Sequence, residues 1–561
     1  MSNFRRTALA SVINLALLSI PDAQAADTAA LEKRIRELES RLTKMDQLEA
    51  RLEKLDRASA LPAKSSPAAA QALPNSSPSP EVAKLNQKVN ILERKLEVQE
   101  EVNTGAFKKL PLFEAGADGF KITSQDKKHQ LRIGSTIQTD YRNFVGDNPP
   151  AWIPGSPGFY GGVGPNSIFL RQARIILEGH VFKDIFFKIM PDFAQNTNTS
   201  NLLPDAYVDF AYVPQASLLV GKYKPSIGLE RLQGDANTAF LERAFPTNLA
   251  PNRDVGIQLH GAFAMPGYKI ETAPGPIDTK NAFTYQVGIT DGTGDSGNSY
   301  GSGGPTQSFA NNKEFDGRIF AQPFQHSGYD WLEGFGIGLA GSFSNPDHQT
   351  LQAQRTPLGQ SQFIDYTQLN ANTQGGLRTV TADGNSNRIY PQAFWYKGPF
   401  GLMGEYVAST QTLNASGAGG ISKVNNVSQT NTAAQVQVSY VVTGEDNAFE
   451  GVKPLRNFDP FNGSWGALQL AARWTQLNVD SDTFKILDPT KSASKAIAGT
   501  FGANWFLNKY ALIRFDYEYV AFDGGAGTSK TTGTGNNAVT TYFIANRPSE
   551  QVISTRFQLA F

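Results

Sequence analysis

Charged side chains gather in residues 224–254, a segment whose residue types suit the binding of anions. Basic and acidic residues are interleaved along it in equal number: Lys224, Arg231, Arg243 and Arg253 against Glu230, Asp235, Glu242 and Asp254. The planar fork of an arginine can donate two hydrogen bonds to one tetrahedral oxyanion. A neighbouring carboxylate weakens the hold on the bound ion and so favours its release. We therefore expect an anion site built for exchange rather than for retention.

The same segment carries more apolar residues than a loop projecting into water would need: Ile227, Leu229, Leu232, Phe240, Leu241 and Phe245. Apolar side chains gain free energy when they leave water. We therefore expect them to fold the segment against an inner wall of the protein.

That wall is predicted by the period of the sequence beyond residue 130. Apolar and polar residues alternate there with a period of two, as from Phe283 to Ile289, which is typical of strands with one apolar face. We count about sixteen such strands, beginning near residues 131, 168, 186, 205, 217, 255, 281, 314, 333, 387, 399, 432, 464, 495, 509 and 549. An even number of antiparallel strands can close without leaving an unpaired edge, as a lipid bilayer requires. We therefore predict an all-β fold, a transmembrane antiparallel β-barrel of about 16 strands.

Connection lengths and composition fit a barrel of this kind. Short links such as residues 183–184 and 397–399 alternate with long links rich in Gly, Pro and Asn, such as residues 344–387. The chain contains 52 Gly, 36 Phe and 18 Tyr, yet its mean hydropathy is only −0.33, as expected when alternate residues face lipid and water. Its 51 basic and 51 acidic residues balance, so no global charge argues for nucleic acid as a partner. A lumen of this size is wider than its own side chains can fill, so its expected chemistry is permeation.

No pattern in the sequence argues for catalysis or for a metal site. Gly294-Asp295-Ser296-Gly297 matches the motif around a serine-protease nucleophile, but it lies in a Gly/Ser/Asn tract without the strand that such a nucleophile needs. The five histidines are scattered without zinc spacing, and the chain contains no cysteine. We expect no enzymatic activity, no cofactor and no metal.

The N-terminal part of the chain is organised differently from the barrel. Two arginines, a short apolar run and Ala23-Gln24-Ala25 predict a secretory signal peptide. Leucine-rich heptads on both sides of a Pro/Ala/Ser linker predict an α-helical coiled coil in the periplasm, with a single amphipathic helix as the alternative. The predicted parts are a signal peptide, a coiled coil, a linker, a second coiled-coil segment and the barrel: residues 1–25, 26–60, 61–80, 81–105 and 106–561.

A series of short motifs runs in a fixed order along residues 130–561: Ile133-Gly134, Gln138-Thr139-Asp140-Tyr141, Arg171-Gln172-Ala173-Arg174, Phe182-Lys183-Asp184, Pro204-Asp205-Ala206-Tyr207, Val220-Gly221-Lys222-Tyr223-Lys224, Phe240-Leu241-Glu242-Arg243, Gly502-Ala503-Asn504-Trp505-Phe506-Leu507-Asn508 and the final Phe561. In this order they resemble the phosphate-selective porins of the O and P type. The resemblance implies a trimer of such barrels, each with its third loop folded inward.

The resemblance also implies which side chains bind the anion. The basic pair and the aspartate of the family's phosphate site match Arg231, Arg243 and Asp205 in this chain. Arg171 matches one rung of the arginine ladder that guides anions inward in the family. Lys224 joins this set as a pore-lining candidate, although a lysine at a turn can equally well be solvated.

Two departures from the family pattern imply a weaker anion preference. Gln172 and Thr136 stand where the arginine ladder has arginine. Arg132, Arg142 and Arg174 face inward by strand parity and could substitute, although an arginine on a barrel strand more often pairs with a carboxylate of the lumen.

Together these observations predict passive diffusion of small anions, phosphate in particular, through a loop-constricted aqueous pore in the outer membrane of a Gram-negative bacterium. The expected partners are membrane lipid, the permeating anion, other copies of the chain in a homotrimer and, through the coiled coil, peptidoglycan. The alternative is a general diffusion porin with little selectivity, whose coiled coil acts as a cell-wall tether.

Overall fold

The computed structural model describes Gln87, Asn90, Ile91, Arg94, Lys95 and residues 111–116, 119–145, 166–194, 202–270, 281–296, 313–367, 377–417, 423–532 and 539–561. The chain divides into two compact units, Met1–Val98 and Gln99–Phe561. The described residues of the first unit are helical, and the predicted signal peptide, linker and remaining coiled-coil residues lie outside the described residues. No helix within the described ranges is long and apolar enough to cross a bilayer.

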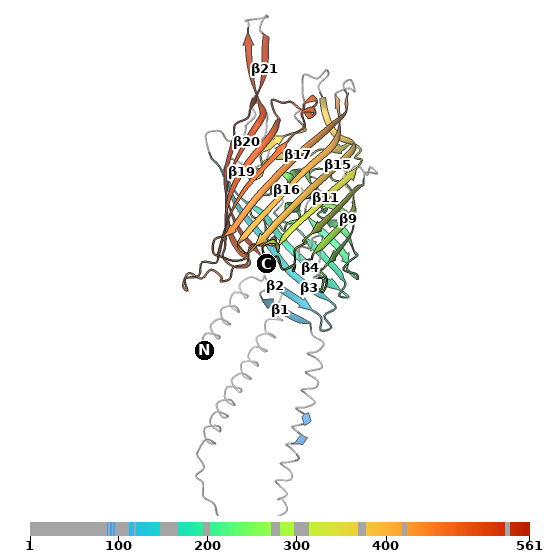
Figure 1. Ribbon diagram of the computed structural model, residues 1–561, viewed down its shortest axis with the longest axis vertical. Helices are drawn as coiled ribbons and strands as arrows, with labels where there is room; N and C mark the ends of the chain where they lie inside the picture. Colours follow the sequence, from blue (N-terminus) through green and yellow to red (C-terminus); the bar gives the residue numbers. More distant parts are fainter. Residues whose placement is uncertain are drawn as a thin grey trace, which may run out of the picture. The chain divides into compact units, whose positions relative to one another are not determined.

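The second unit is a closed antiparallel β-barrel (Figure 1), which confirms the predicted fold class. Of the 20 strands that form its sheet in the described residues, 16 make up the barrel. They are β3 (Gln130–Phe144), β4 (Asn166–Val181), β5 (Ile185–Met190), β6 (Asp205–Phe210), β7 (Ser217–Tyr223), β8 (Asp254–Phe263), β9 (Phe283–Thr290), β10 (Glu314–Ala321), β11 (Phe335–Ser344), β15 (Leu377–Lys397), β16 (Phe400–Gly417), β17 (Lys423–Val441), β18 (Ala467–Asn478), β19 (Ala493–Phe506), β20 (Ala511–Thr532) and β22 (Glu550–Ala560). Each strand pairs with the next in this order, and β22 pairs with β3 to close the circle, with Arg556 opposite Asp140.

The period of two in the sequence separates the two faces of the barrel wall. On β8, Ile257 and Leu259 are 51% and 42% exposed on the outer face, whereas Gln258 between them is fully buried on the inner face. Opposite faces of a strand carry successive side chains, so the outer face meets lipid and the inner face can be polar. Each predicted strand corresponds to one of the observed barrel strands.

Aromatic residues mark the end of the barrel where the connections are short. The indole nitrogen of Trp395 donates a hydrogen bond to the carbonyl of Trp331 at 3.0 Å, and that of Trp505 donates one to Trp465 at 2.6 Å. Trp331 and Trp465 are both more than half exposed. Amphipathic rings of this kind favour the boundary between lipid and water.

Several elements extend or precede the barrel strands, and the sequence did not predict them. A hairpin of β1 (Leu112–Gly116) and β2 (Gly119–Thr123) pairs with β3. At the other end β20 continues into a long hairpin with β21 (Val539–Asn546), which projects beyond the barrel rim in Figure 1. The strands predicted to begin near residues 387 and 432 start earlier, at Leu377 and Lys423, because β15, β16 and β17 stay paired far into the predicted loops.

The remaining short elements lie in the connections: α4 (Leu229–Leu232), η2 (Phe245–Leu249), η3 (Asp330–Leu332), β12 (Gln349–Thr350), β13 (Gln354–Arg355), β14 (Gln362–Ile364) and η5 (Ser481–Lys485). The connection between β17 and β18 is long for a turn at the short-connection end. Its Phe449 is buried against Leu229, Phe394 and Met403, so this connection folds into the lumen.

Candidate functional site

Residues 224–253, between β7 and β8 and here called loop 3, fold inside the barrel as predicted. The six apolar residues noted in the sequence are all at most 4% exposed. The wall also binds the loop backbone: Leu229 N–H donates to Glu405 at 2.6 Å, and Leu241 N–H donates to Asp516 at 2.7 Å. Inward-facing polar residues of β16 and β20 thus satisfy loop amides that water would otherwise hydrate. Loop 3 therefore narrows the lumen from within.

Asp235 in loop 3 is the meeting point of four basic side chains. Arg174 of β4 and Arg243 contact its carboxylate directly, Lys224 Nζ lies 3.2 Å from it, and Arg253 Nη2 lies 3.6 Å from it. Burial alone would raise the pKa of Asp235, but Lys224 and the arginines outweigh burial and hold the pKa well below its usual value. Asp235 is therefore ionised at neutral pH.

Arg231 lies beside this cluster, in α4, without contacting Asp235. Its Nη1 donates to Asn252 at 2.9 Å and its Nη2 donates to the carbonyl of Thr247 at 2.7 Å. Burial, together with the charges of Arg243 and Arg253, lowers the pKa of Arg231 to about 9. At neutral pH Arg231 thus contributes positive charge while neutral oxygen atoms hold its guanidinium in place.

Asp205 joins the wall to the same cluster. It begins β6, and its carboxylate lies 2.8 Å from Nε of Arg253 and 3.8 Å from Nζ of Lys188. Val208 and Phe210 on the same strand are exposed on the outer face, so alternation along the strand turns Asp205 towards the lumen. The structure therefore brings Asp205, Lys224, Arg231 and Arg243 into one neighbourhood.

Counted together with the adjacent Arg231, the cluster around Asp235 has more positive than negative groups. Its arginines are Arg174, Arg231, Arg243 and Arg253, and its carboxylates are Asp192, Asp205 and Asp235. Four minus three leaves one positive charge, and a protonated Lys224 adds another. Burial, helped by the charges of Arg243 and Arg253, holds the pKa of Lys224 well below its ordinary value even though Asp235 opposes the shift. A positive excess in a narrowed lumen favours anions over cations.

Arg171, the fifth predicted site residue, belongs to a neighbouring network. Its Nε and Nη2 bind the two carboxylate oxygens of Glu242 at 2.6 and 3.0 Å. Glu242 also lies 3.3 Å from Arg556, which in turn binds Asp140. Burial alone would raise the pKa of Glu242, but Arg171 and Arg556 lower the pKa to about 2. This network fastens loop 3 to β4 and β22.

A break in the strand pairing lets Arg171 and Arg174 reach the same lumen. Residues three apart on a regular strand point to opposite faces. The register between β3 and β4 shifts at Gln138 and Thr139, which leaves Arg171 as an extra residue. The parity argument alone could not have placed both arginines.

The other inward arginines of the sequence prediction serve the structure of the lumen. Arg132 pairs with Glu178. Arg142 donates to the carbonyl of Gly359 at 3.2 Å and lies over the ring of Phe169. The expected pairing with a lumen carboxylate is met by Arg132 and by Arg174, which contacts Asp192 and Asp235. Arg142 instead contacts a carbonyl and an aromatic ring.

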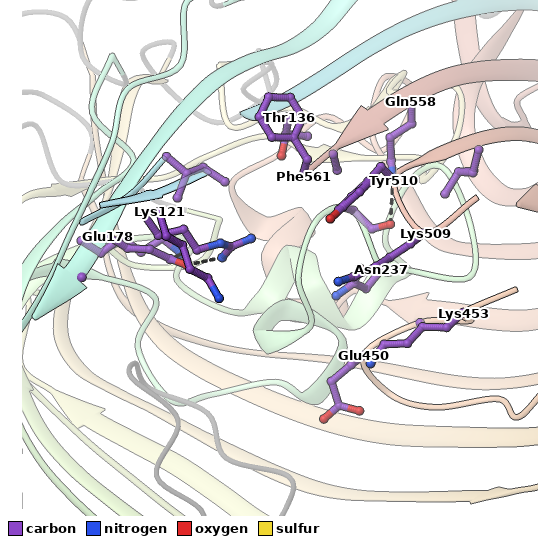
Figure 2. Close-up of a pocket in the computed structure, with 18 of the residues that line it drawn as sticks. Lys121, Thr136, Glu178, Asn237, Glu450, Lys453, Lys509, Tyr510, Gln558 and Phe561 are labelled. Atoms are coloured by element: carbon purple, nitrogen blue, oxygen red, sulfur yellow. Dashed lines mark hydrogen bonds and ion pairs between the residues drawn. The ribbon is translucent and has the colours of Figure 1, made fainter. Parts of the chain in front are cut away.

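Next to the cluster, a cavity of about 660 Å³ opens at the short-connection end of the barrel. Figure 2 shows Lys121 and Glu178 on one side of this vestibule and Lys453, Lys509 and Glu450 on the other. Ala236 and Asn237, which follow Asp235, line it too. The cationic cluster is therefore adjacent to open, water-accessible space.

On the opposite side of the lumen, three loops build an apolar cluster that the sequence did not predict. It fills the space inside the long-connection ends of β15–β20, and its larger members are Ile227, Phe245, Leu249, Phe363, Ile364, Tyr366, Val380, Tyr390, Val407, Leu413, Leu477, Ile486, Leu487, Val520 and Phe522. Residues 345–367, the described part of loop 5 between β11 and β15, thus fold inward like loop 3. The apolar residues of loop 5 were the signal that could have revealed this.

At the rim, Asp347, His348 and Asp383 place their ligand atoms within 4.8 Å of one another. Sequence spacing could not show this group because Asp383 lies on β15. Asp347 and His348 are exposed, and the imidazole Nδ1 bonds to the neighbouring Asp347, which accounts for the arrangement without an ion.

Comparisons with known proteins agree with this architecture. The chain matches the family "Phosphate-selective porin O and P" over residues 156–561. Similar solved structures are OmpT of Vibrio cholerae (8% identity, TM-score 0.42, covering 77% of this chain and 99% of that one), an anion-selective porin from Comamonas acidovorans (9%, 0.42, 77% and 100%) and OprB of Pseudomonas putida (11%, 0.40, 78% and 95%). No curated protein sequence matches the chain. On the family match, which covers most of its length, the chain belongs to the phosphate-selective porin O and P family of outer-membrane porins.

Proposed function

We propose that this outer-membrane porin passes small anions, phosphate in particular, by passive diffusion through a constriction formed by loop 3. The observation that supports the proposal is the convergence of Arg174, Lys224, Arg243 and Arg253 on one point of the narrowed lumen. Arginine donors in fixed positions replace the water around an oxyanion at little cost in reorganisation.

The path of the ion follows from which charged groups water can reach. Arg171 of β4 and Lys188 of β5 are 33% and 25% exposed, whereas Arg473 of β18 is 1% exposed. The apolar cluster occupies the side of β15–β20. We infer that an anion passes along β4–β8, from the vestibule through the Asp205 and Asp235 region to Arg171.

The filled lumen favours selective passage over general diffusion. A wide water-filled channel would leave charged side chains far apart and screened beyond about 8–10 Å. Here loop 3 and loop 5 both occupy the barrel interior, so the permeating ion must contact the basic side chains. A general diffusion porin with little selectivity would require that these basic side chains move away from the path of the ion.

The assembly and export of the chain are part of the same proposal. We propose a homotrimer in the outer membrane, a signal peptide over residues 1–25, and a periplasmic coiled coil over residues 26–60 and 81–105. The Leu/Glu/Lys-rich heptads support the coiled coil. Its binding to peptidoglycan would add a tether without replacing the channel.

The test is single-channel recording in planar bilayers under a KCl gradient, followed by addition of phosphate. For the wild type we expect a reversal potential that shows anion preference, and a chloride current that phosphate blocks. Arg243→Ala should weaken the block roughly ten- to a hundredfold, as expected for loss of a charge-assisted hydrogen bond worth about 1.5–3 kcal/mol.

Arg132→Ala provides the matched control, because it removes the same charge from the vestibule wall and leaves loop 3 untouched. It should change the block much less than Arg243→Ala. A wild type with no ionic preference and no phosphate block would contradict the proposal and favour a general diffusion porin.

A further inference from the structure

Asp235 lies at the point where the four basic side chains of the constriction, Arg174, Lys224, Arg243 and Arg253, meet. It lies in the turn between α4 and η2 of loop 3, not on the barrel wall. Its two carboxylate oxygens take contacts from four cations on β4, on loop 3 and at both ends of that loop. A carboxylate and a phosphate offer the same kind of acceptor oxygen to arginine and lysine. Asp235 therefore fills the position that a permeating oxyanion would occupy.

The basic side chains do not depend on Asp235 for their placement. Arg174 also binds Asp192 at 2.7 Å, and Arg253 also binds Asp205 at 2.8 Å. Arg243 donates to the carbonyls of Glu230 and Gln233 at 2.9 and 2.8 Å. Lys224 donates to the carbonyl of Gln233 at 3.3 Å. The four donors would thus still point at the same place if the Asp235 side chain left it.

The turn that carries Asp235 borders the open vestibule. The next two residues of its turn, Ala236 and Asn237, line the open vestibule. The Asp235 side chain is 10% exposed, whereas that of Asp192 beneath Arg174 is fully buried. A rotation of Asp235 about its side-chain bonds can therefore move its carboxylate away from the four basic side chains and towards water without unfolding loop 3.

We infer that Asp235 is a tethered anion that competes with the permeating anion for the four basic side chains and so sets the affinity of the constriction. Each passage exchanges the carboxylate for the incoming oxyanion, and the return of the carboxylate helps the ion to leave. Asp235 is thus a specificity-determining residue, distinct from the donors that hold the ion. This inference rests on the proposed anion passage.

The variant Asp235→Asn tests it, because the amide keeps the size of the side chain and removes the charge. We expect phosphate to block the chloride current of this variant at roughly tenfold lower concentration than in the wild type, since the ion no longer displaces a unit charge at close range. The reversal potential should move towards stronger anion preference. Glu178→Gln is the matched control: it also removes one lumen carboxylate, but Glu178 pairs with Arg132 and Lys188, not with the four cations.

Each outcome decides between the competitor and an ordinary structural carboxylate. Tighter block in Asp235→Asn with little change in Glu178→Gln supports the inference. Weaker block in Asp235→Asn, or equal shifts in the two variants, overturns it, because Asp235 would then organise the donors or act only through net charge. If the wild type lacks anion preference and Asp235→Asn acquires it, the proposed function fails while the competitor role stands.

A second measurement needs no variant and covers the case in which Asp235→Asn does not fold. The structure of the wild-type porin is determined with and without saturating phosphate. We expect phosphate among the four basic side chains, with the Asp235 carboxylate turned towards the vestibule. Phosphate bound elsewhere, with all Asp235 contacts intact, would overturn the inference.

Discussion

Acidification is expected to release loop 3 from β4 and β22 through protonation of Glu242. This residue is the anion that Arg171 and Arg556 share, and its side chain is only 10% exposed. Its pKa of about 2 in the folded protein lies below the ordinary value of 4.5. A lowered pKa means that the interaction stabilises the fold fully above about pH 4.5 and is lost as the pH falls towards 2.

The size of the effect follows from the shift in pKa. A difference of roughly 2.5 units, at about 1.36 kcal/mol per unit, corresponds to about 3 kcal/mol. Glu242 and Arg556 are 10% and 3% exposed and only Arg171 reaches water, so solvent screening removes a minor part of this figure. The free energy of unfolding should therefore fall by about 3 kcal/mol through this one group between neutral pH and pH ~2.

The assay is urea unfolding of the barrel in phospholipid vesicles as a function of pH, for the wild type and Glu242→Gln. Glutamine does not titrate, whereas every other carboxylate is common to the two proteins. The difference between their free energies of unfolding at each pH therefore reports on Glu242 alone. The wild type should be more stable at neutral pH, and the difference should vanish near pH ~2. A difference that stays constant with pH, or no difference at neutral pH, would refute the role of Glu242 as the clamp.

Two further perturbations test the packing behind the constriction. Phe245→Ala should lower the free energy of unfolding by about 3 kcal/mol, because its fully buried ring contacts Phe363 with the centroids 5.5 Å apart. The same variant should raise the current noise of single channels. Phe501→Ala on the lipid face should not raise this noise. Gly221→Ala should lower the free energy of unfolding in urea by roughly 1–3 kcal/mol, because its φ of +135° favours glycine and a Cβ would lie 2.3 Å from a backbone oxygen of β6. Gly499→Ala, with no atom within 4 Å of the added carbon, should leave the free energy of unfolding nearly unchanged.

The sequence predicted those features that depend on periodicity and on burial of apolar residues. Alternation located the barrel strands and the inward side of Asp205, because the pleat of a strand forces successive side chains to opposite faces. The apolar residues of loop 3 predicted its inward fold, because a loop in water gains nothing from Phe240 or Phe245. These arguments need only local sequence.

Other features depend on contacts between distant residues and could not be predicted in this way. The extra residue that turns Arg171 inward has no local signature, since the register of β3 against β4 is decided over the whole strand pair. Asp235 was one of four acidic residues in its segment, and only the fold shows that it meets Arg174 and Arg253. The inward fold of loop 5 was overlooked although Leu358, Phe363 and Ile364 carry the same apolar signal that was used for loop 3.

The seam between β22 and β3 sets an order on the folding of this porin. Arg556 and Asp140, which pair across the seam, are 416 residues apart in the chain. Contacts with such separation form slowly, because closing a long loop costs entropy before any contact repays it. Arg556 also donates to the carbonyl of Leu241 at 2.7 Å, so loop 3 docks partly on β22, the strand that closes the barrel. The constriction can therefore mature only after the barrel has closed, and β3 must remain without this partner until β22 has been made.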